Sequence, residues 1–85
     1  MAELLKVQKF AISDIYVPTK RRTTLDPKKV GEIAESMLAS GQTTPIMVRA
    51  DGKRFVLVEG LHRLEACKAL GEATVAGILV HARQG

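Results

Sequence analysis

The residues of this sequence best suited to chemistry are Gly60, His62 and Arg63, which follow one another closely. An apolar run at residues 55–58 predicts a strand that stops at Gly60, and a helix is expected to begin directly after it. The first backbone N–H groups of a helix have no partner inside it, and the helix dipole favours negative charge there. Glycine lets a ligand approach the backbone, while arginine and histidine donate to phosphate oxygens. We therefore predict a phosphate-binding site made of Gly60, Leu61, His62 and Arg63.

Each ionisable residue of this segment also has a second interpretation. Arg63 is a cation where the helix dipole disfavours one, which favours a bound anion, but it could instead pair with Glu59, four residues earlier. His62 could donate to a phosphate or pack against a loop. Glu59 is the weak candidate for a catalytic carboxylate, and it could hold Mg²⁺ together with bound phosphates or form the pair with Arg63. The two histidines and the single cysteine are well separated, so we expect no site with protein ligands only.

Capping and turn signals predict the elements that position this segment. Asp26 and Pro27 predict the start of a helix, and Gly41 predicts its end. Asp51-Gly52 between two apolar runs predicts a hairpin. The predicted elements are a first strand at residues 5–12 followed by a turn near 13–14, a basic loop at 18–24, a helix at 27–40, a hairpin of 46–49 and 54–58, a helix at 61–70 and a strand at 74–80.

The order strand, helix, hairpin, helix, strand predicts an α+β fold in which a small mixed sheet packs with two main helices. The 85 residues suffice for one small domain spanning residues 1–85. The single cysteine, Cys67, excludes an internal disulfide and suits the cytoplasm. It lies three residues from both Leu64 and Leu70, so we predict a buried, inert thiol. No segment is long enough to span a bilayer, so no membrane partner is expected.

Two motifs resemble those of one protein superfamily. Residues 60–66, GLHRLEA, resemble the Gly-Cys-His-Arg-x-Glu-Ala signature of sulfiredoxins and the Gly-Glu-Arg-Arg-x-Arg-Ala box of ParB partition proteins. Residues 41–49, GQTTPIMVR, resemble the Gly-x-x-x-Pro-Ile-x-Val-Arg segment of the ParB proteins. With the first strand, the basic loop and the helix at 27–40, the resemblance spans roughly residues 8 to 80. The sequence is therefore similar to a stand-alone ParB/sulfiredoxin-like domain.

The resemblance implies nucleotide binding, and the differences from each family limit the chemistry. Leu61 stands where sulfiredoxins have their nucleophilic cysteine, so sulfinic acid reduction is not expected. Glu65 replaces the third arginine of the ParB box, and Thr44 replaces the usual glutamine before Pro45. The identity of the nucleotide base is therefore left open, and the expected cofactor is CTP or ATP with Mg²⁺. The residues implied as further nucleotide or DNA contacts are Arg21, Arg22, Thr44 and Arg49.

Three classes of function follow. The first is a nucleotide-binding ParB-like domain in plasmid or chromosome partition or related DNA maintenance. The second is a small nucleotide-dependent enzyme, namely a kinase, nucleotide hydrolase or nuclease. The third is a basic DNA-binding accessory protein that uses no nucleotide, because a net charge of +4 favours anionic partners. No helix-turn-helix follows the domain, so operator recognition by this chain alone is not expected. A homodimer or a partner protein is expected, with Leu4, Leu5 and Val7 as its contact, unless these residues only complete the sheet.

Overall fold

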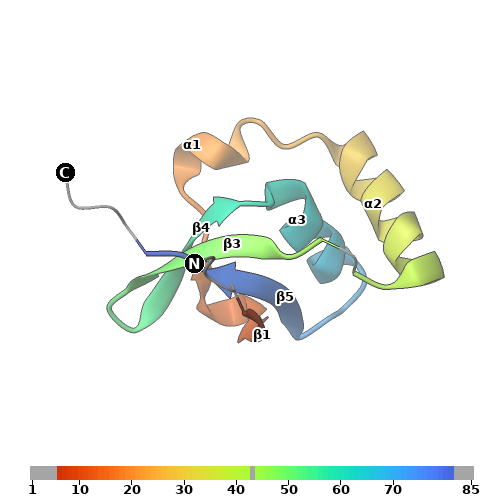
Figure 1. The fold of residues 1–85 in the computed structure, drawn as a ribbon. Coiled ribbons are helices and arrows are strands. Elements are labelled where there is room, and N and C mark those ends of the chain that lie inside the picture. The colour runs from red at the N-terminus through yellow and green to blue at the C-terminus, as the bar shows by residue number, and fades with distance from the viewer. Residues whose placement is uncertain (1–5, 43, 82–85) are drawn as a thin grey trace, which may run out of the picture.

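The computed structural model describes residues 6–42 and 44–81. They form a five-stranded mixed sheet in the order β1-β5-β3-β4-β2, with helices on one side of it (Figure 1). This confirms the predicted α+β class. The elements in chain order are β1 (Val7–Ala11), the 3-10 turn η1 (Ile12–Asp14), β2 (Ile15–Tyr16), α1 (Thr19–Arg22), α2 (Pro27–Ser40), β3 (Ile46–Asp51), β4 (Arg54–Glu59), α3 (Leu61–Ala69) and β5 (Thr74–Leu79).

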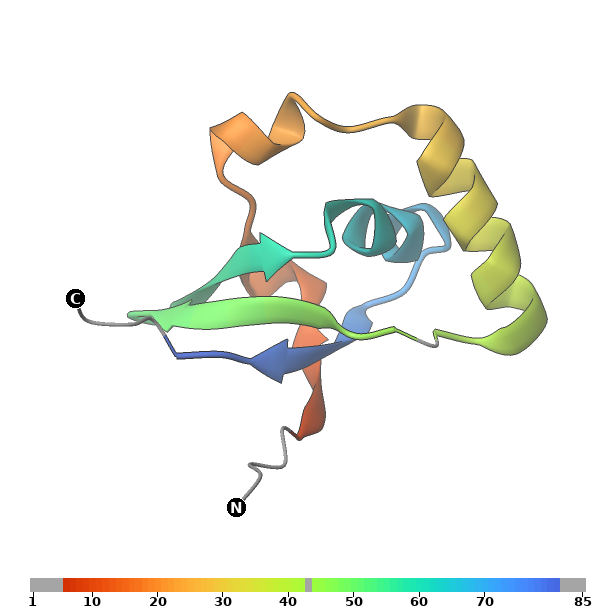
Figure 2. The same cartoon turned by 45° about the horizontal axis from the view of Figure 1, so that its top comes forward.

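The sheet combines both kinds of strand pairing. β1 runs antiparallel to β5, and the β3–β4 hairpin is antiparallel, whereas β3 is parallel to β5 and β2 is parallel to β4. The chain between α1 and α2 passes over the start of α3, and α2 then runs beside α3 (Figures 1 and 2). This arrangement places the start of α2, the start of α3 and the end of β4 in one region of the molecule.

The hydrophobic core lies between the sheet and α3. Ile46 and Val48 of β3 and Leu64 of α3 are fully buried. Phe10 and Phe55 meet edge to face, with ring centroids 4.9 Å apart and an interplanar angle of 70°. These rings come from β1 and β4, which are not neighbours in the sheet, so the sheet curves strongly enough to close its inner face around the core.

The capping residues fix α2 at the predicted bounds. The Asp26 carboxylate accepts a hydrogen bond from the Lys28 N–H at 3.0 Å, and Pro27 occupies the first helical position. At the other end, Gly41 has a φ of +78° and donates its N–H to the Met37 carbonyl at 2.7 Å. This helix has strong local punctuation at both ends, which is why its limits could be predicted.

Several predicted bounds are corrected by the structure. The basic segment 18–24 is not all loop, because α1 forms a single turn closed by an Arg22 N–H to Pro18 carbonyl contact of 3.4 Å. Thr23 supports that turn by donating its hydroxyl to the Lys20 carbonyl at 2.8 Å. A helix of four residues has no apolar periodicity to detect. The turn near 13–14 is confirmed as η1, while α3 ends one residue earlier than predicted, at Ala69, and β5 ends at Leu79.

Candidate functional site

The candidate site is a hollow of about 290 Å³ at the junction of β4 and α3. We call it the β4–α3 hollow. The structure brings together here the four residues predicted to bind phosphate and also the Glu59 carboxylate. The lining consists of Thr24, Ile33, Glu59, Gly60, Leu61, His62 and Arg63. The two residues from outside the motif, Thr24 and Ile33, come from the α1–α2 segment and from α2.

The backbone at the start of α3 is open to a ligand. Gly60 is the N-cap residue, with φ 105° and ψ 34°, and no side chain caps the helix. The first intrahelical bond runs from the Leu64 N–H to the Gly60 carbonyl at 2.9 Å. The N–H groups of residues 61–63 therefore precede the helical ladder and can donate to an anion. In contrast, α2 is capped by its own Asp26 carboxylate.

The first turns of α2 and α3 both carry basic residues. Arg63 and His62 are half-buried on the first turn of α3, and Lys28 and Lys29 occupy the first turn of α2. Neither first turn contains an acidic residue. Cations at these positions oppose the helix dipoles, so they are not explained by helix stability alone.

His62 makes a contact that the sequence did not reveal. Its Nε2 accepts a hydrogen bond from the backbone N–H of Asp26 at 3.0 Å, across 36 residues of chain. In this arrangement Nε2 cannot donate to a phosphate, and the remaining donor of a neutral ring is Nδ1–H. No local pattern signals this contact, because its partners meet only through the packing of α2 against α3.

The other predicted contact residues come from three further segments of the chain. Arg21 and Arg22 belong to α1, and Arg22 is exposed. Thr44 is exposed two residues before β3. Arg49 follows Val48, which is fully buried, so strand alternation places Arg49 on the outer face of the sheet. The structure does not bring Arg49 to the β4–α3 hollow.

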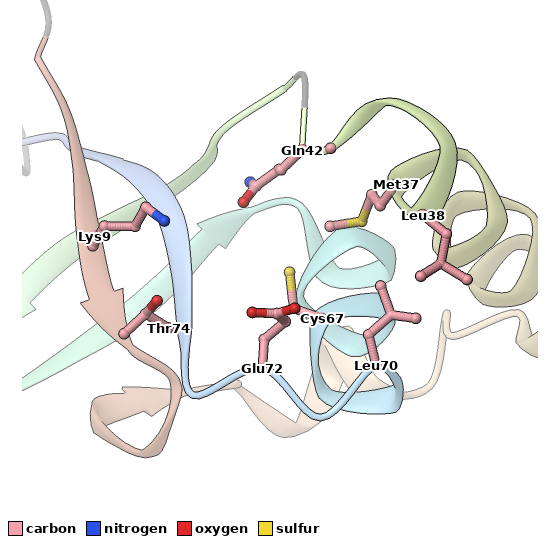
Figure 3. Close-up of a pocket in the computed structure, with 9 residues that line it drawn as sticks. Lys9, Met37, Leu38, Gln42, Cys67, Leu70, Glu72 and Thr74 are labelled. Carbon is pink, nitrogen blue, oxygen red and sulfur yellow. The ribbon is translucent and has the colours of Figure 1, made fainter.

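A second hollow lies on the flank of α3, beside the start of β5 (Figure 3). It measures about 270 Å³, and its lining includes Lys9, Met37, Gln42, Cys67 and Glu72. Cys67 is 2% exposed and has no disulfide partner, which confirms the predicted burial. Burial and then the negative charge of Glu72 raise the pKa of the thiol, and the charges of Arg63 and Lys9 only partly oppose them. A thiol with a raised pKa is a poor nucleophile at neutral pH.

Gln42 joins the segment after α2 to β5, which the sequence also did not reveal. Its Nε2 donates to the carbonyls of Ala76 and Thr44, and its Oε1 accepts from the Ala76 N–H, each at 2.9 Å. The side chain therefore pairs with β5 much as another strand would. Its partner in β5 lies 34 residues away in sequence, so no local pattern could have predicted this role.

Neither a membrane-spanning helix nor a cluster of metal ligands occurs in the described ranges, 6–42 and 44–81. No helix there is long and apolar enough to cross a membrane. No group of three or more His, Cys, Asp and Glu side chains there gathers as a metal site. The single carboxylate of Glu59 at the β4–α3 hollow fits an ion such as Mg²⁺ that is held partly by phosphates, and not one held by protein ligands alone.

The fold is shared with solved structures of the ParB/sulfiredoxin class. Sulfiredoxin from Arabidopsis thaliana superimposes with a TM-score of 0.81 at 26% identity, over 91% of this chain and 86% of that one. The C-terminally truncated chromosome-partitioning protein ParB from Caulobacter crescentus, complexed with CTP-gamma-S, gives 0.74 at 20% identity, over 94% of this chain and 46% of that one. The fold thus defines a ParB/sulfiredoxin-like protein.

The sequence identifies the family within this class. The ParB N-terminal domain model matches residues 2–84, so the chain belongs to the ParB N-terminal domain family. It is 38% identical over 58 residues to the chromosome-partitioning protein ParB of Myxococcus xanthus, and the aligned region covers 68% of this chain and 20% of that protein. It is also 32% identical over 76 residues to the nucleoid occlusion protein of Shouchella clausii, over 87% of this chain and 26% of that protein. The chain spans about a fifth to a quarter of the curated relatives that it matches.

Proposed function

We propose that this chain is a nucleotide-binding module of the ParB type that works in plasmid or chromosome partition or in related DNA maintenance. The observation that carries the proposal is the uncapped start of α3, which opens into a hollow beside His62 and Arg63. Free backbone N–H groups, a helix dipole and a guanidinium act in the same direction on a bound anion. We therefore expect the site to bind phosphate. We also expect the protein to work in the cytoplasm.

The small volume of the β4–α3 hollow favours a site that encloses the phosphates of a nucleotide rather than the whole molecule. At about 290 Å³ the hollow is at the lower end of the range for small-molecule pockets. We expect the triphosphate to lie against residues 60–63 and the base to lie outside the hollow. Glu59 would reach a Mg²⁺ ion held by the phosphates, which would supply charge neutralisation when bound. Arg22 of α1 and Thr44 remain proposed contacts for the rest of the nucleotide, together with Arg21.

Relatives support a nucleotide without deciding which one. The Caulobacter crescentus ParB structure contains CTP-gamma-S, and a free serine kinase of the same fold was solved with AMP and with ADP. At 20% and at 16% to 17% identity these structures establish a shared fold alone, and their nucleotides indicate which ligands to test. We therefore propose a nucleoside triphosphate with Mg²⁺, and leave CTP and ATP as the two forms to be compared.

A second candidate function is favoured by the position of Glu59. A carboxylate beside bound phosphates is one of the parts that a phosphotransferase or hydrolase requires. A third candidate is binding to DNA without nucleotide, favoured by the basic residues at the start of α2, Lys28 and Lys29. Arg49, on the outer face of the sheet, would serve DNA rather than the hollow.

One panel of measurements tests these functions. Calorimetric titrations with CTP, ATP and GTP, each with Mg²⁺, measure binding, and phosphate release under the same conditions measures turnover. We expect binding of at least one triphosphate and shifts of the amide signals of residues 60–63 in NMR spectra. Binding with turnover would favour the enzyme. Binding only to duplex DNA, with an affinity that falls steeply with salt, would favour the accessory protein and overturn the nucleotide site.

We also propose that the chain associates with a second copy of itself or with a partner protein. β1 is an edge strand of the described sheet, and Val7 on it is 58% exposed. Val7 pairs with Ile78 of β5, so from Val7 onwards the strand does complete the sheet. Leu4 and Leu5, the other residues predicted at this contact, lie outside the described residues.

A further inference from the structure

The starts of α2 and α3 are joined by one side chain. The His62 Nε2 accepts the backbone N–H of Asp26 at 3.0 Å, and His62 is half-buried at the β4–α3 hollow. A nitrogen that accepts a hydrogen bond carries no proton, so this contact assigns the neutral ring with its proton on Nδ1. A protonated imidazole has donors on both nitrogens and could not make the contact.

Asp26 is held on two sides by different groups. Its carboxylate accepts from the Lys28 N–H at 3.0 Å and caps α2, while its own N–H is taken by His62. Just before it, the Leu25 N–H donates to the Arg22 carbonyl at 3.3 Å. The short segment between α1 and α2 is thereby fixed at both ends. Thr24 lies within this segment and lines the hollow.

From this geometry we infer that His62 is a positioning residue of the nucleotide site. Its neutral ring holds the segment between α1 and α2 as a wall of the hollow, and it does not bind phosphate through Nε2. Binding of the anion then falls to Arg63 and to the backbone N–H groups of residues 61–63. The expected effect of His62 on nucleotide affinity rests on the proposed nucleotide function. The hydrogen bond between His62 and Asp26, which we call the anchor, is a property of the free protein.

Two substitutions separate positioning from phosphate contact. His62→Phe keeps a planar ring but removes the acceptor, whereas His62→Gln keeps an acceptor at the end of a side chain of similar reach. In the free protein we expect hydrogen exchange at the Asp26 amide to accelerate about three- to tenfold in His62→Phe, the range for loss of one neutral hydrogen bond. The parent and His62→Gln should exchange at similar rates, and the ¹⁵N signals of the parent ring should show the Nδ1–H form.

The same variants should differ in nucleotide affinity. Titrations with CTP and ATP, each with Mg²⁺, should show a loss of about three- to tenfold for His62→Phe and a loss of less than about twofold for His62→Gln. Equal losses in both variants would overturn the positioning role and assign His62 to the phosphates. An Asp26 exchange rate that is unchanged in His62→Phe would overturn the anchor itself. A parent protein that binds no nucleotide would instead overturn the proposed function, whatever the exchange rates show.

Discussion

Gly60 lies so close to Ile46 that a Cβ at this position would force one of the two residues to shift. A Cβ on Gly60 would lie 2.7 Å from Cγ2 of Ile46, a side chain that is fully buried at the start of β3. The φ of Gly60 is also +105°, a region that residues with a Cβ rarely adopt. The glycine of the motif is therefore required by two features of the fold, independently of any ligand. It fixes the turn that aims the start of α3 into the hollow.

Gly60→Ala should destabilise the fold more than the same change at another left-handed glycine. Overpacking typically costs about 1 to 3 kcal/mol, and a strained φ adds about 1 to 3 kcal/mol. Gly71 is the matched control, because its φ is +78° but a Cβ there would have no atom within 4 Å. Urea denaturation should give a larger loss of unfolding free energy for Gly60→Ala than for Gly71→Ala. Equal losses would show that Ile46 moves aside freely.

Arg63→Ala should weaken nucleotide binding by about 1.5 to 3 kcal/mol while leaving the fold intact, because it removes a charge-assisted hydrogen bond to phosphate. Lys53→Ala is the control, since it removes the same charge from the exposed hairpin turn. Calorimetry gives the affinity and thermal unfolding gives the stability. An affinity for Arg63→Ala equal to that of the parent would contradict the assignment. If Arg63 instead serves mainly to pair with Glu59, Glu59→Gln should lower stability rather than affinity.

The parts of the fold that the sequence predicted are those with local signals. The helix at 27–40 is marked by Asp26, Pro27 and Gly41, and the structure has the same bounds. The hairpin is marked by Asp51-Gly52, with Gly52 at a φ of +63° as its turn requires. In both cases the residues that set the structure are neighbours in the chain, so their types alone carry the information.

The parts that were missed depend on contacts between distant residues. β2 is only two residues long and exists because Ile15 and Tyr16 pair with Phe55 and Val56. The contact of His62 with Asp26 and that of Gln42 with Ala76 span 36 and 34 residues. The motif therefore predicted where the hollow lies. The segment between α1 and α2 that forms its opposite wall could not be predicted, because it meets the motif only through the packing of α2 against α3.

Gln42→Ala should lower the free energy of unfolding by about 1 to 3 kcal/mol, because it leaves the part-buried N–H and carbonyl of Ala76 without their partner. Gln8→Ala is the control, because Gln8 is exposed on β1 and surface changes usually stay within about 0.5 kcal/mol. Urea denaturation measures both, and hydrogen exchange at the Ala76 amide should be faster only in Gln42→Ala. If the two variants are equally stable, water replaces the amide without cost.

Self-association, if it uses β1, should be sensitive to charge at Val7. We expect light scattering at micromolar concentration to show a dimer in the parent and less of it in Val7→Lys, since lysine on an edge strand opposes strand pairing. Leu38→Lys is the control, because Leu38 is 73% exposed but belongs to α2 and not to the edge strand β1. A monomer at every concentration, with and without nucleotide, would contradict association. A dimer that only Leu38→Lys disrupts would move the contact to α2.

Cys67 should behave as a core residue at neutral pH and as a small source of alkaline instability. We expect slow labelling by thiol reagents in the native state, unchanged nucleotide binding in Cys67→Ala, and a loss of about 1 to 3 kcal/mol of unfolding free energy in Cys67→Ser from a buried unpaired hydroxyl.

Burial first, and Glu72 second, raise the pKa of the folded Cys67 thiol, so the unfolded chain ionises earlier as the pH rises. Cys67 therefore contributes stability below about pH 8.5, the ordinary cysteine pKa, and loses it progressively above that pH. Parent and Cys67→Ala should thus converge in unfolding free energy as the pH is raised from about 7.5 to about 9.5. Rapid native-state labelling, or a difference between the two that widens with pH, would indicate an accessible thiolate and point to redox sensing.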